Sequence, residues 1–184
     1  MGRIDPQIFT RKDGGQVLIR TAEGGDARRL LEIGREVMAE REFTLTEPDE
    51  LNLSEKQETQ WIEGYFKHPS KLILLAEIAD EVVGIIDFSC GSRRRNSHTG
   101  EFGMSVVKKW RHFGVGEALL RSLLIWAEKS DGIEKVSLAV HATNEHAISL
   151  YRKLGFEEEG RKKRDVRFGP EEYTDSILMS RFVK

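Results

Sequence analysis

The segment that most constrains the fold is a pair of long apolar runs separated by only two residues. The runs are KLILLAEI at Lys71–Ile78 and EVVGIIDFSC at Glu81–Cys90, and Ala79 and Asp80 stand between them. Apolar runs of this length favour strands, and a connection of two residues can join only antiparallel neighbours. We therefore predict an antiparallel pair of strands joined by a tight turn.

The rest of the chain alternates between strand and helix patterns. Further strands are predicted at 16–22, 100–107, 135–140, 156–166 and 173–183. Apolar residues at helical spacing predict helices at 26–40, 54–68, 114–129 and 144–154. Ser54 and Gln57 have the spacing of a capping box, and Gly155 is a typical helix end. This order predicts an α/β protein with helices on both faces of a mixed, mostly antiparallel sheet of about six to seven strands.

Composition narrows the class of protein. The 184 residues suit one domain, and 39% hydrophobic with 33% charged residues is typical of a soluble globular chain. The net charge of -2 gives no basic field for nucleic acid, and the single Cys90 excludes a disulfide within the chain. No apolar run is long enough for a signal peptide or a membrane span. We expect a cytoplasmic protein with a flexible arm at 1–15 and one domain at 16–184.

A glycine-bearing loop, KWRHFGVG, runs from Lys109 to Gly116 between a predicted strand and a predicted helix. The N-terminus of a helix leaves N–H groups unpaired at its positive end, and glycines let an anion approach the backbone. This arrangement can bind a phosphate or pyrophosphate. It fits neither the Walker pattern nor the dinucleotide fingerprint, because no GKS or GKT occurs after it and Leu119 replaces the third glycine. Taken alone, the glycine pair is as consistent with a structural role.

A second segment, NEHAISLYRKLGF at 144–156, places Ala147, Leu150, Tyr151 and Leu154 on one helical face. An amphipathic helix with a core tyrosine explains this pattern when it is taken alone. A buried phenol nevertheless needs a hydrogen-bond partner, which a functional site can supply.

Together the two segments resemble the GNAT superfamily of N-acetyltransferases. The loop has the family pattern Q/R-x-x-G-x-G/A, and the helix has N-x-x-A-x-x-L-Y-x-K-x-G-F. The residues that carry the resemblance are Arg111, Gly114 and Gly116 in the loop, and Asn144, Ala147, Leu150, Tyr151, Lys153, Gly155 and Phe156 in the helix. One helix and one strand separate the segments, as in the family. A departure is Lys108 and Lys109, where many members have proline and an acidic residue.

The resemblance implies acetyl-CoA as co-substrate and an amine as acceptor. Main-chain N–H groups of the loop would bind the pyrophosphate; the loop residues are Arg111, His112, Phe113, Gly114, Val115 and Gly116. On the preceding strand, which splays from its neighbour in the family, the pantetheine arm and thioester carbonyl would be bound by Met104, Ser105 and Val106. Further cofactor contacts are implied for Asn144, Ala147 and Lys153. Tyr151 would direct its hydroxyl at the thioester sulfur.

The implied mechanism is direct attack in a ternary complex. Cys90 lies on a predicted strand, where a free cysteine is usually inert, so no acyl-enzyme is expected. Glu101, on the strand face of Gly103 and Ser105, is our candidate proton acceptor, directly or through water; an ordinary surface glutamate is the alternative. His141 and His146 are five residues apart and share no helical face, and the five histidines form no metal-ligand cluster. We therefore expect no metal.

The acceptor stays open at this level. A small amine such as a polyamine, an amino acid or an amine-bearing toxin is the leading interpretation. A protein N-terminus or lysine, presented in a peptide, is the second, and a non-catalytic acyl-CoA-binding module is the third. We expect neither a nucleic acid nor a membrane partner, and a homodimer is left open.

Overall fold

A computed structural model describes residues 2–184, and these residues form a single eight-stranded sheet in the order β1-β2-β3-β4-β5-β6-β8-β7. The strands are β1 (Gln7–Thr10), β2 (Gln16–Thr21), β3 (Lys71–Ile78), β4 (Glu81–Cys90), β5 (Thr99–Val106), β6 (Lys135–His141), β7 (Glu157–Arg167) and β8 (Tyr173–Phe182). Neighbouring strands pair antiparallel except β5 and β6, which are parallel. The helices are α1 (Ala27–Ala39), α2 (Glu55–Lys67), α3 (Val115–Lys129) and α4 (Glu145–Lys153). The predicted mixed, mostly antiparallel fold is confirmed.

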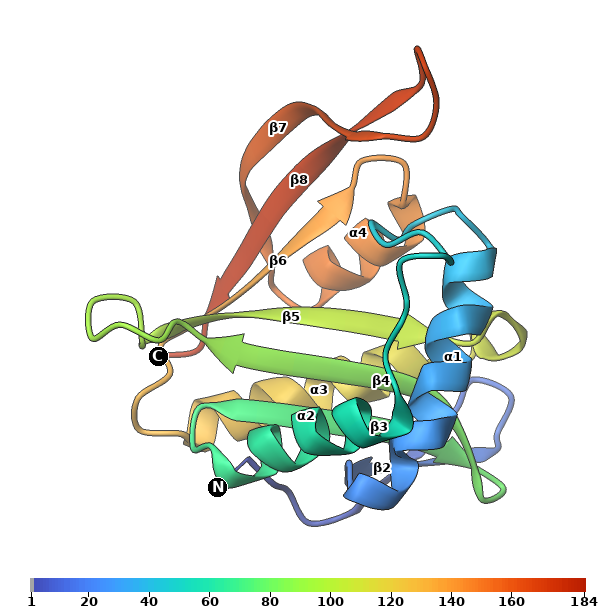
Figure 1. The fold of residues 1–184 in the computed structure, drawn as a ribbon. Helices are drawn as coiled ribbons and strands as arrows, with labels where there is room; N and C mark the ends of the chain where they lie inside the picture. Colours follow the sequence, from blue (N-terminus) through green and yellow to red (C-terminus); the bar gives the residue numbers. More distant parts are fainter. Residues whose placement is uncertain (1) are drawn as a thin grey trace.

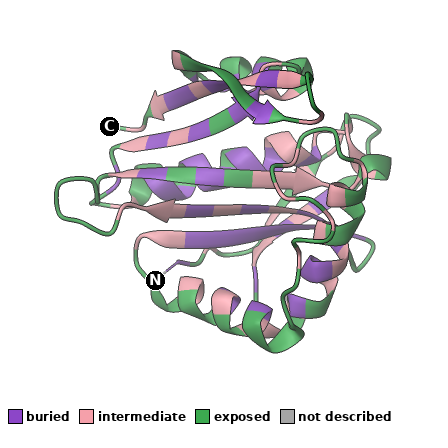
Figure 2. Cartoon of the chain, turned by 45° about the horizontal axis from the view of Figure 1, so that its top comes forward, coloured by how far each residue is buried: buried purple, intermediate pink, exposed green. Residues whose placement is uncertain are grey.

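The helices form two layers, with α1 and α2 on one face of the sheet and α3 and α4 on the other (Figure 1). Each layer has its own core. Ile33 of α1 and Ile62 of α2 pack with Leu75 of β3, whereas Leu119 and Leu123 of α3 belong to the larger cluster on the opposite face. Buried residues accordingly concentrate in the central strands and α3, as Figure 2 shows. The sheet is therefore sandwiched, and its two faces can present different chemistry.

Local signals place most element ends where the sequence predicted them. Ala79 and Asp80 both have positive φ, 49° and 62°, as a type I′ hairpin turn requires. The Ser54 hydroxyl accepts a hydrogen bond from the Gln57 N–H while the Gln57 side chain accepts one from the Ser54 N–H, which completes the capping box of α2. Gly155 ends α4 with φ 82°. These features need only neighbouring residues, which is why a sequence pattern reveals them.

The start of the chain differs from our expectation. Within the segment 1–15, for which we predicted only an arm, the structure has strand β1 paired antiparallel with β2. The turn after β1 reaches the glycine-bearing loop, because the Lys12 N–H donates to the Phe113 carbonyl at 3.1 Å. A four-residue edge strand with two apolar residues has too little pattern of its own, so its pairing depends on the neighbouring strand.

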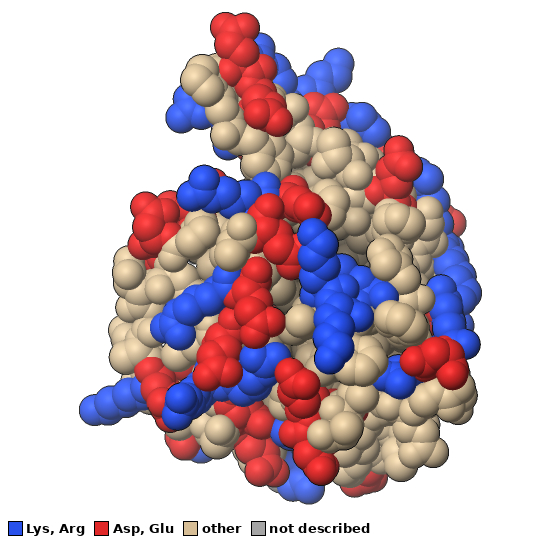
Figure 3. Space-filling view, turned by 90° about the vertical axis from the view of Figure 1, so that its right-hand side faces the viewer, with Lys and Arg blue, Asp and Glu red and all other residues tan. Residues whose placement is uncertain are grey.

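The surface carries both signs of charge. On the side shown in Figure 3, basic and acidic side chains are interspersed, in keeping with the net charge of -2. The β7–β8 hairpin extends away from the helical layers (Figure 1). Of the helices in the described residues, none is both long and apolar enough to cross a membrane.

Candidate active site

The sheet opens between its two parallel strands. β5 and β6 pair at only three positions, Thr99 with Lys135, Gly100 with Val136 and Glu101 with Ser137. Beyond these pairs the two strands diverge, as Figure 1 shows. Met104, Ser105 and Val106 pair with β4 on one side but have no strand partner on the side of β6. Their free main-chain edge can pair with an extended ligand in the way that an added strand would.

The glycine-bearing loop leads from the open end of β5 into α3. His112 and Gly114 have positive φ, 68° and 92°, and Gly114 is the N-cap of the helix. A Cβ on Gly116 would make ordinary contact with Met104, 3.4 Å from its Cε, so the start of α3 lies beside β5. Among the described residues, no acceptor is found for the N–H groups from His112 to Gly116. The loop therefore offers a row of free donors at the positive end of a helix, which suits a diphosphate.

The side chain of Arg111 connects this loop to neighbouring segments. Its guanidinium forms two hydrogen bonds of 2.7 Å with Glu40, just after α1, and Nε donates to the Val106 carbonyl at 2.9 Å. Its main-chain N–H already donates to the Lys108 carbonyl at 3.2 Å. The row of free donors thus begins at His112, and Arg111 itself ties together the loop, α1 and the end of β5.

Tyr151 comes from α4 on the same side of the sheet. Its ring packs edge-on against Phe102 of β5, with centroids 5.7 Å apart, and only 7% of the residue is exposed. Burial raises the pKa of the phenol to about 12. The phenol is therefore a protonated donor at neutral pH and stands beside the strand that borders the opening.

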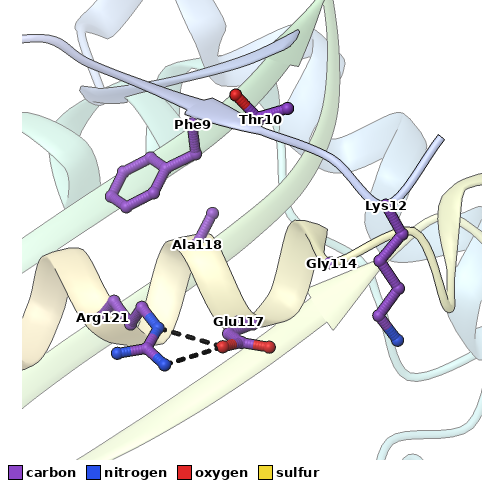
Figure 4. A pocket seen from close by; sticks show the side chains of 7 residues that line it. All are labelled: Phe9, Thr10, Lys12, Gly114, Glu117, Ala118 and Arg121. Atoms are coloured by element: carbon purple, nitrogen blue, oxygen red, sulfur yellow. Dashed lines mark hydrogen bonds and ion pairs between the residues drawn. The ribbon is translucent and has the colours of Figure 1, made fainter. Parts of the chain in front are cut away.

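The remaining cofactor candidates have structural partners. The Asn144 side-chain oxygen accepts from the Ala147 N–H at 3.2 Å and so caps α4, which leaves the amide NH₂ to donate elsewhere. Lys153 pairs with Glu117 at 2.7 Å. This ion pair and Arg121 hold the pKa of Glu117 below its usual value. Glu117 and Arg121 also border the shallow hollow between β1 and α3 that begins at Gly114 (Figure 4).

Acidic groups gather on the opposite face, under α2. Glu101 is exposed and lies between Ser89 and Ser137 in the sheet register. Asp87 of β4, opposite Gly103 of β5, was not among the residues predicted from the sequence. Burial raises the pKa of Asp87 to about 6. An aspartate inside an otherwise apolar strand is itself unusual, and that signal was present in the sequence.

Glu58 of α2 lies near enough to Asp87 for the two charges to interact. Burial, and secondly the charge of Asp87, raises the pKa of Glu58. Neither carboxylate has a basic partner within 4.0 Å among the described residues. Two carboxylates without a cation form a place where a ligand ammonium would be stabilised. No group of three or more potential metal ligands occurs in the described part of the chain.

Comparison with known proteins agrees with this geometry. Residues 33–156 match the model of the Acetyltransferase (GNAT) family. An L-amino acid N-acetyltransferase of Escherichia coli is 31% identical over 90% of this chain and 98% of its own length. An N-alpha-acetyltransferase of Sulfurisphaera tokodaii is 26% identical over 80% of this chain and 84% of its own length. The crystal structure of a GNAT acetyltransferase from Streptococcus pneumoniae superposes with a TM-score of 0.87, at 28% identity over 91% of this chain and 99% of that one.

The fold and the opening between β5 and β6 thus place this protein among the acyltransferases. The chain belongs to the GNAT family of acetyltransferases and is an N-acetyltransferase enzyme.

Proposed function

We propose that this enzyme transfers the acetyl group of acetyl-CoA to the primary amine of a small molecule, with an L-α-amino acid as the foremost acceptor. The observation that carries the proposal is the β5–β6 opening, which has free N–H donors and a phenol on one side and uncompensated carboxylates on the other. The Escherichia coli relative, aligned over nearly its whole length, supports an amino acid as acceptor.

Acetyl-CoA would bind as a substrate across the first face. The main-chain donors from His112 to Gly116 would hold the diphosphate, and the pantetheine arm would run along Met104, Ser105 and Val106. Asn144 can donate its amide to that arm, while Ala147 and Lys153 border it from α4. The absence of side chains at Gly114 and Gly116 leaves room for phosphates, which is the fit expected for this ligand.

The acceptor would enter from the opposite face, where Glu58 and Asp87 attract an ammonium group. The neutral amine then attacks the thioester carbonyl carbon, and an N–H of the β5 edge near Val106 stabilises the developing oxyanion. As the C–N bond forms and the C–S bond breaks, the electron pair leaves with the sulfur. The sequence suggests Glu101 as a candidate proton acceptor, directly or through water.

Tyr151 would act on the leaving sulfur mainly through a hydrogen bond. A phenol of pKa about 12 would lose ~5 kcal/mol in a complete transfer to a thiolate of pKa about 8.5. A hydrogen bond that strengthens as charge develops on sulfur avoids this cost. Direct transfer without an acyl-enzyme fits Cys90, whose thiol pKa is raised by burial.

The second candidate keeps the chemistry and changes the acceptor to a protein N-terminus, as the name of the Sulfurisphaera relative suggests for that protein. Both acceptors present an α-amine, so they differ in whether the neighbouring carboxyl is free or continues as a peptide chain. A thiol-release assay with acetyl-CoA should compare L-amino acids, a polyamine and peptides with free N-termini. We expect the highest kcat/KM with a free amino acid. Preference for the peptides would support the second candidate, and acetyl-CoA binding without turnover on any amine would refute both.

A further inference from the structure

His141, the last residue of β6, has an unusual environment for a histidine outside the predicted site. Only 7% of the residue is exposed, and its Nδ1 is buried without a hydrogen-bond partner among the described residues. A buried imidazole nitrogen without a partner is costly unless something else binds there. This nitrogen is therefore free to accept a hydrogen bond or a proton.

The register of the sheet shows which part of the opening His141 borders. Glu101 and Ser137 are the last paired residues of β5 and β6. Four residues further along each strand, His141 of β6 is level with Ser105 of β5. Because side chains alternate between faces, His141 points to the same face of the sheet as Glu101. Glu101 lies four residues earlier, about 13 Å along the strand. His141 is thus level with the part of β5 that is proposed to bind the thioester, whereas Glu101 lies where β5 and β6 are still paired.

Three segments enclose the imidazole. Its ring lies 5.7 Å from that of Phe168 at the β7–β8 hairpin, and its own strand pairs it with Ser176 of β8. Burial lowers the pKa of His141, while the Glu42 main chain after α1 and the charge of Asp165 on β7 act in the opposite direction. Of the other acidic groups on this face, Asp87 and Glu58 lie towards α2. The imidazole is consequently neutral at pH 7 and can accept a proton.

We propose that Nδ1 of His141 accepts the proton of the attacking amine, directly or through one water. This inference rests on the proposed function and assigns the proton acceptor of that reaction. Nδ1 takes one proton from the bound ammonium, which leaves a neutral amine. The amine nitrogen then forms the C–N bond, the C–S bond breaks with its electron pair on sulfur, and the second proton released by the nitrogen reaches the thiolate through water. The imidazolium then loses its proton to water, which restores the enzyme.

The test compares His141→Gln with His98→Gln, both assayed with an amino acid that wild type acetylates. His98 is exposed and serves as the matched control. We expect His141→Gln to lower kcat/KM by about 100-fold or more, whereas His98→Gln stays within about threefold of wild type. In the pH profile of kcat/KM, the apparent pKa of the acidic limb should shift from the range of a histidine to that of the acceptor amine. Acetyl-CoA affinity, measured by calorimetry, should not change.

An acceptor that is already neutral separates this role from a structural one. A hydrazide or an aromatic amine has no proton to lose before attack at pH 7, so the deficit of His141→Gln should shrink by about tenfold or more with such an acceptor. A deficit equal for both acceptors, an unchanged acidic limb, or lost acetyl-CoA binding would overturn the proposal; His141→Asn provides the same comparison if the glutamine variant does not fold. A wild-type enzyme inactive on every amine would instead contradict the proposed function.

Discussion

Glu40 and Arg111 are 71 residues apart in the sequence and are joined by two hydrogen bonds of 2.7 Å. The pair connects the end of α1, on the proposed acceptor face, to the loop that would bind the diphosphate. Because Arg111 also donates to the Val106 carbonyl, one guanidinium fixes three parts of the opening. Both side chains are largely shielded from solvent, with 25% of Arg111 and 15% of Glu40 exposed.

Glu40→Gln should therefore disturb both stability and cofactor binding. Charge-assisted hydrogen bonds of this kind contribute about 1.5–3 kcal/mol, so we expect a loss of about 1–2 kcal/mol in the free energy of unfolding. Acetyl-CoA affinity should fall about tenfold, since about 1.4 kcal/mol of lost preorganisation corresponds to that factor. Urea denaturation and calorimetry measure the two effects.

The matched control for this variant is Glu36→Gln, one turn earlier on α1. Glu36 pairs with Arg29 at 2.8 Å, but 46% of its side chain is exposed, and exposed pairs contribute little. We expect a change below about 0.5 kcal/mol and normal cofactor affinity. Equal effects of the two substitutions would show that the Glu40–Arg111 pair has no special role in shaping the loop.

Tyr151→Phe should lower turnover without weakening cofactor binding. The substitution removes only the hydroxyl, while the ring can keep its edge-on packing against Phe102. We expect kcat to fall by about 10- to 1000-fold and the affinity for acetyl-CoA to stay near that of wild type. Unchanged kcat would remove Tyr151 from the reaction. Since the phenol pKa is about 12, wild type should show no alkaline limb from this group below about pH 11.

Gly114→Asp should weaken acetyl-CoA binding through charge and conformation together. Gly114 has φ 92°, which a residue with a Cβ adopts only with strain, and a carboxylate there would repel the diphosphate. Calorimetry should show at least about a tenfold loss of affinity. Gly132→Asp is the control, because Gly132 has open space around it and an ordinary backbone conformation. Equal affinity in a folded Gly114→Asp variant would contradict binding by this loop.

The sequence predicted best what depends on neighbouring residues. The turn at Ala79 and Asp80, the capping box of Ser54 and the glycine that ends α4 each depend on a few adjacent side chains. Strand β1 escaped prediction because it exists through its pairing with β2. The family motifs likewise located the loop and α4, which are both continuous segments.

The acceptor side of the site was harder to predict because it is assembled from distant segments. Glu40 meets Arg111, Glu58 lies near Asp87, and His141 is enclosed by the segment after α1 and the β7–β8 hairpin. No sequence spacing encodes these encounters. Asp87 alone carried a local signal, as a charged residue within an apolar strand, and its meaning depends on the α2 helix that covers it.

Asp87→Asn should stabilise the enzyme at neutral pH and impair its use of amines. The pKa of Asp87 is about 6 in the folded protein, above the ordinary value of 3.8, so folding favours its protonated form. The stability that this group contributes is complete below about pH 4 and is lost as the pH rises through about 6. Asparagine mimics the neutral form at every pH, so the variant should be about 2–3 kcal/mol more stable than wild type at about pH 7 and about equal to it at about pH 4.

Urea denaturation at both pH values measures this difference, and the exposed Asp131→Asn serves as the control that should show none. The same variant should raise the KM for the acceptor, because the ammonium loses one of its two carboxylates, while acetyl-CoA affinity stays the same. A buried charge kept at a cost in stability is what a binding function predicts, since a site tuned for stability alone would hold a neutral residue. An Asp87→Asn enzyme that is more stable and equally active would show that the carboxylate does not bind the acceptor.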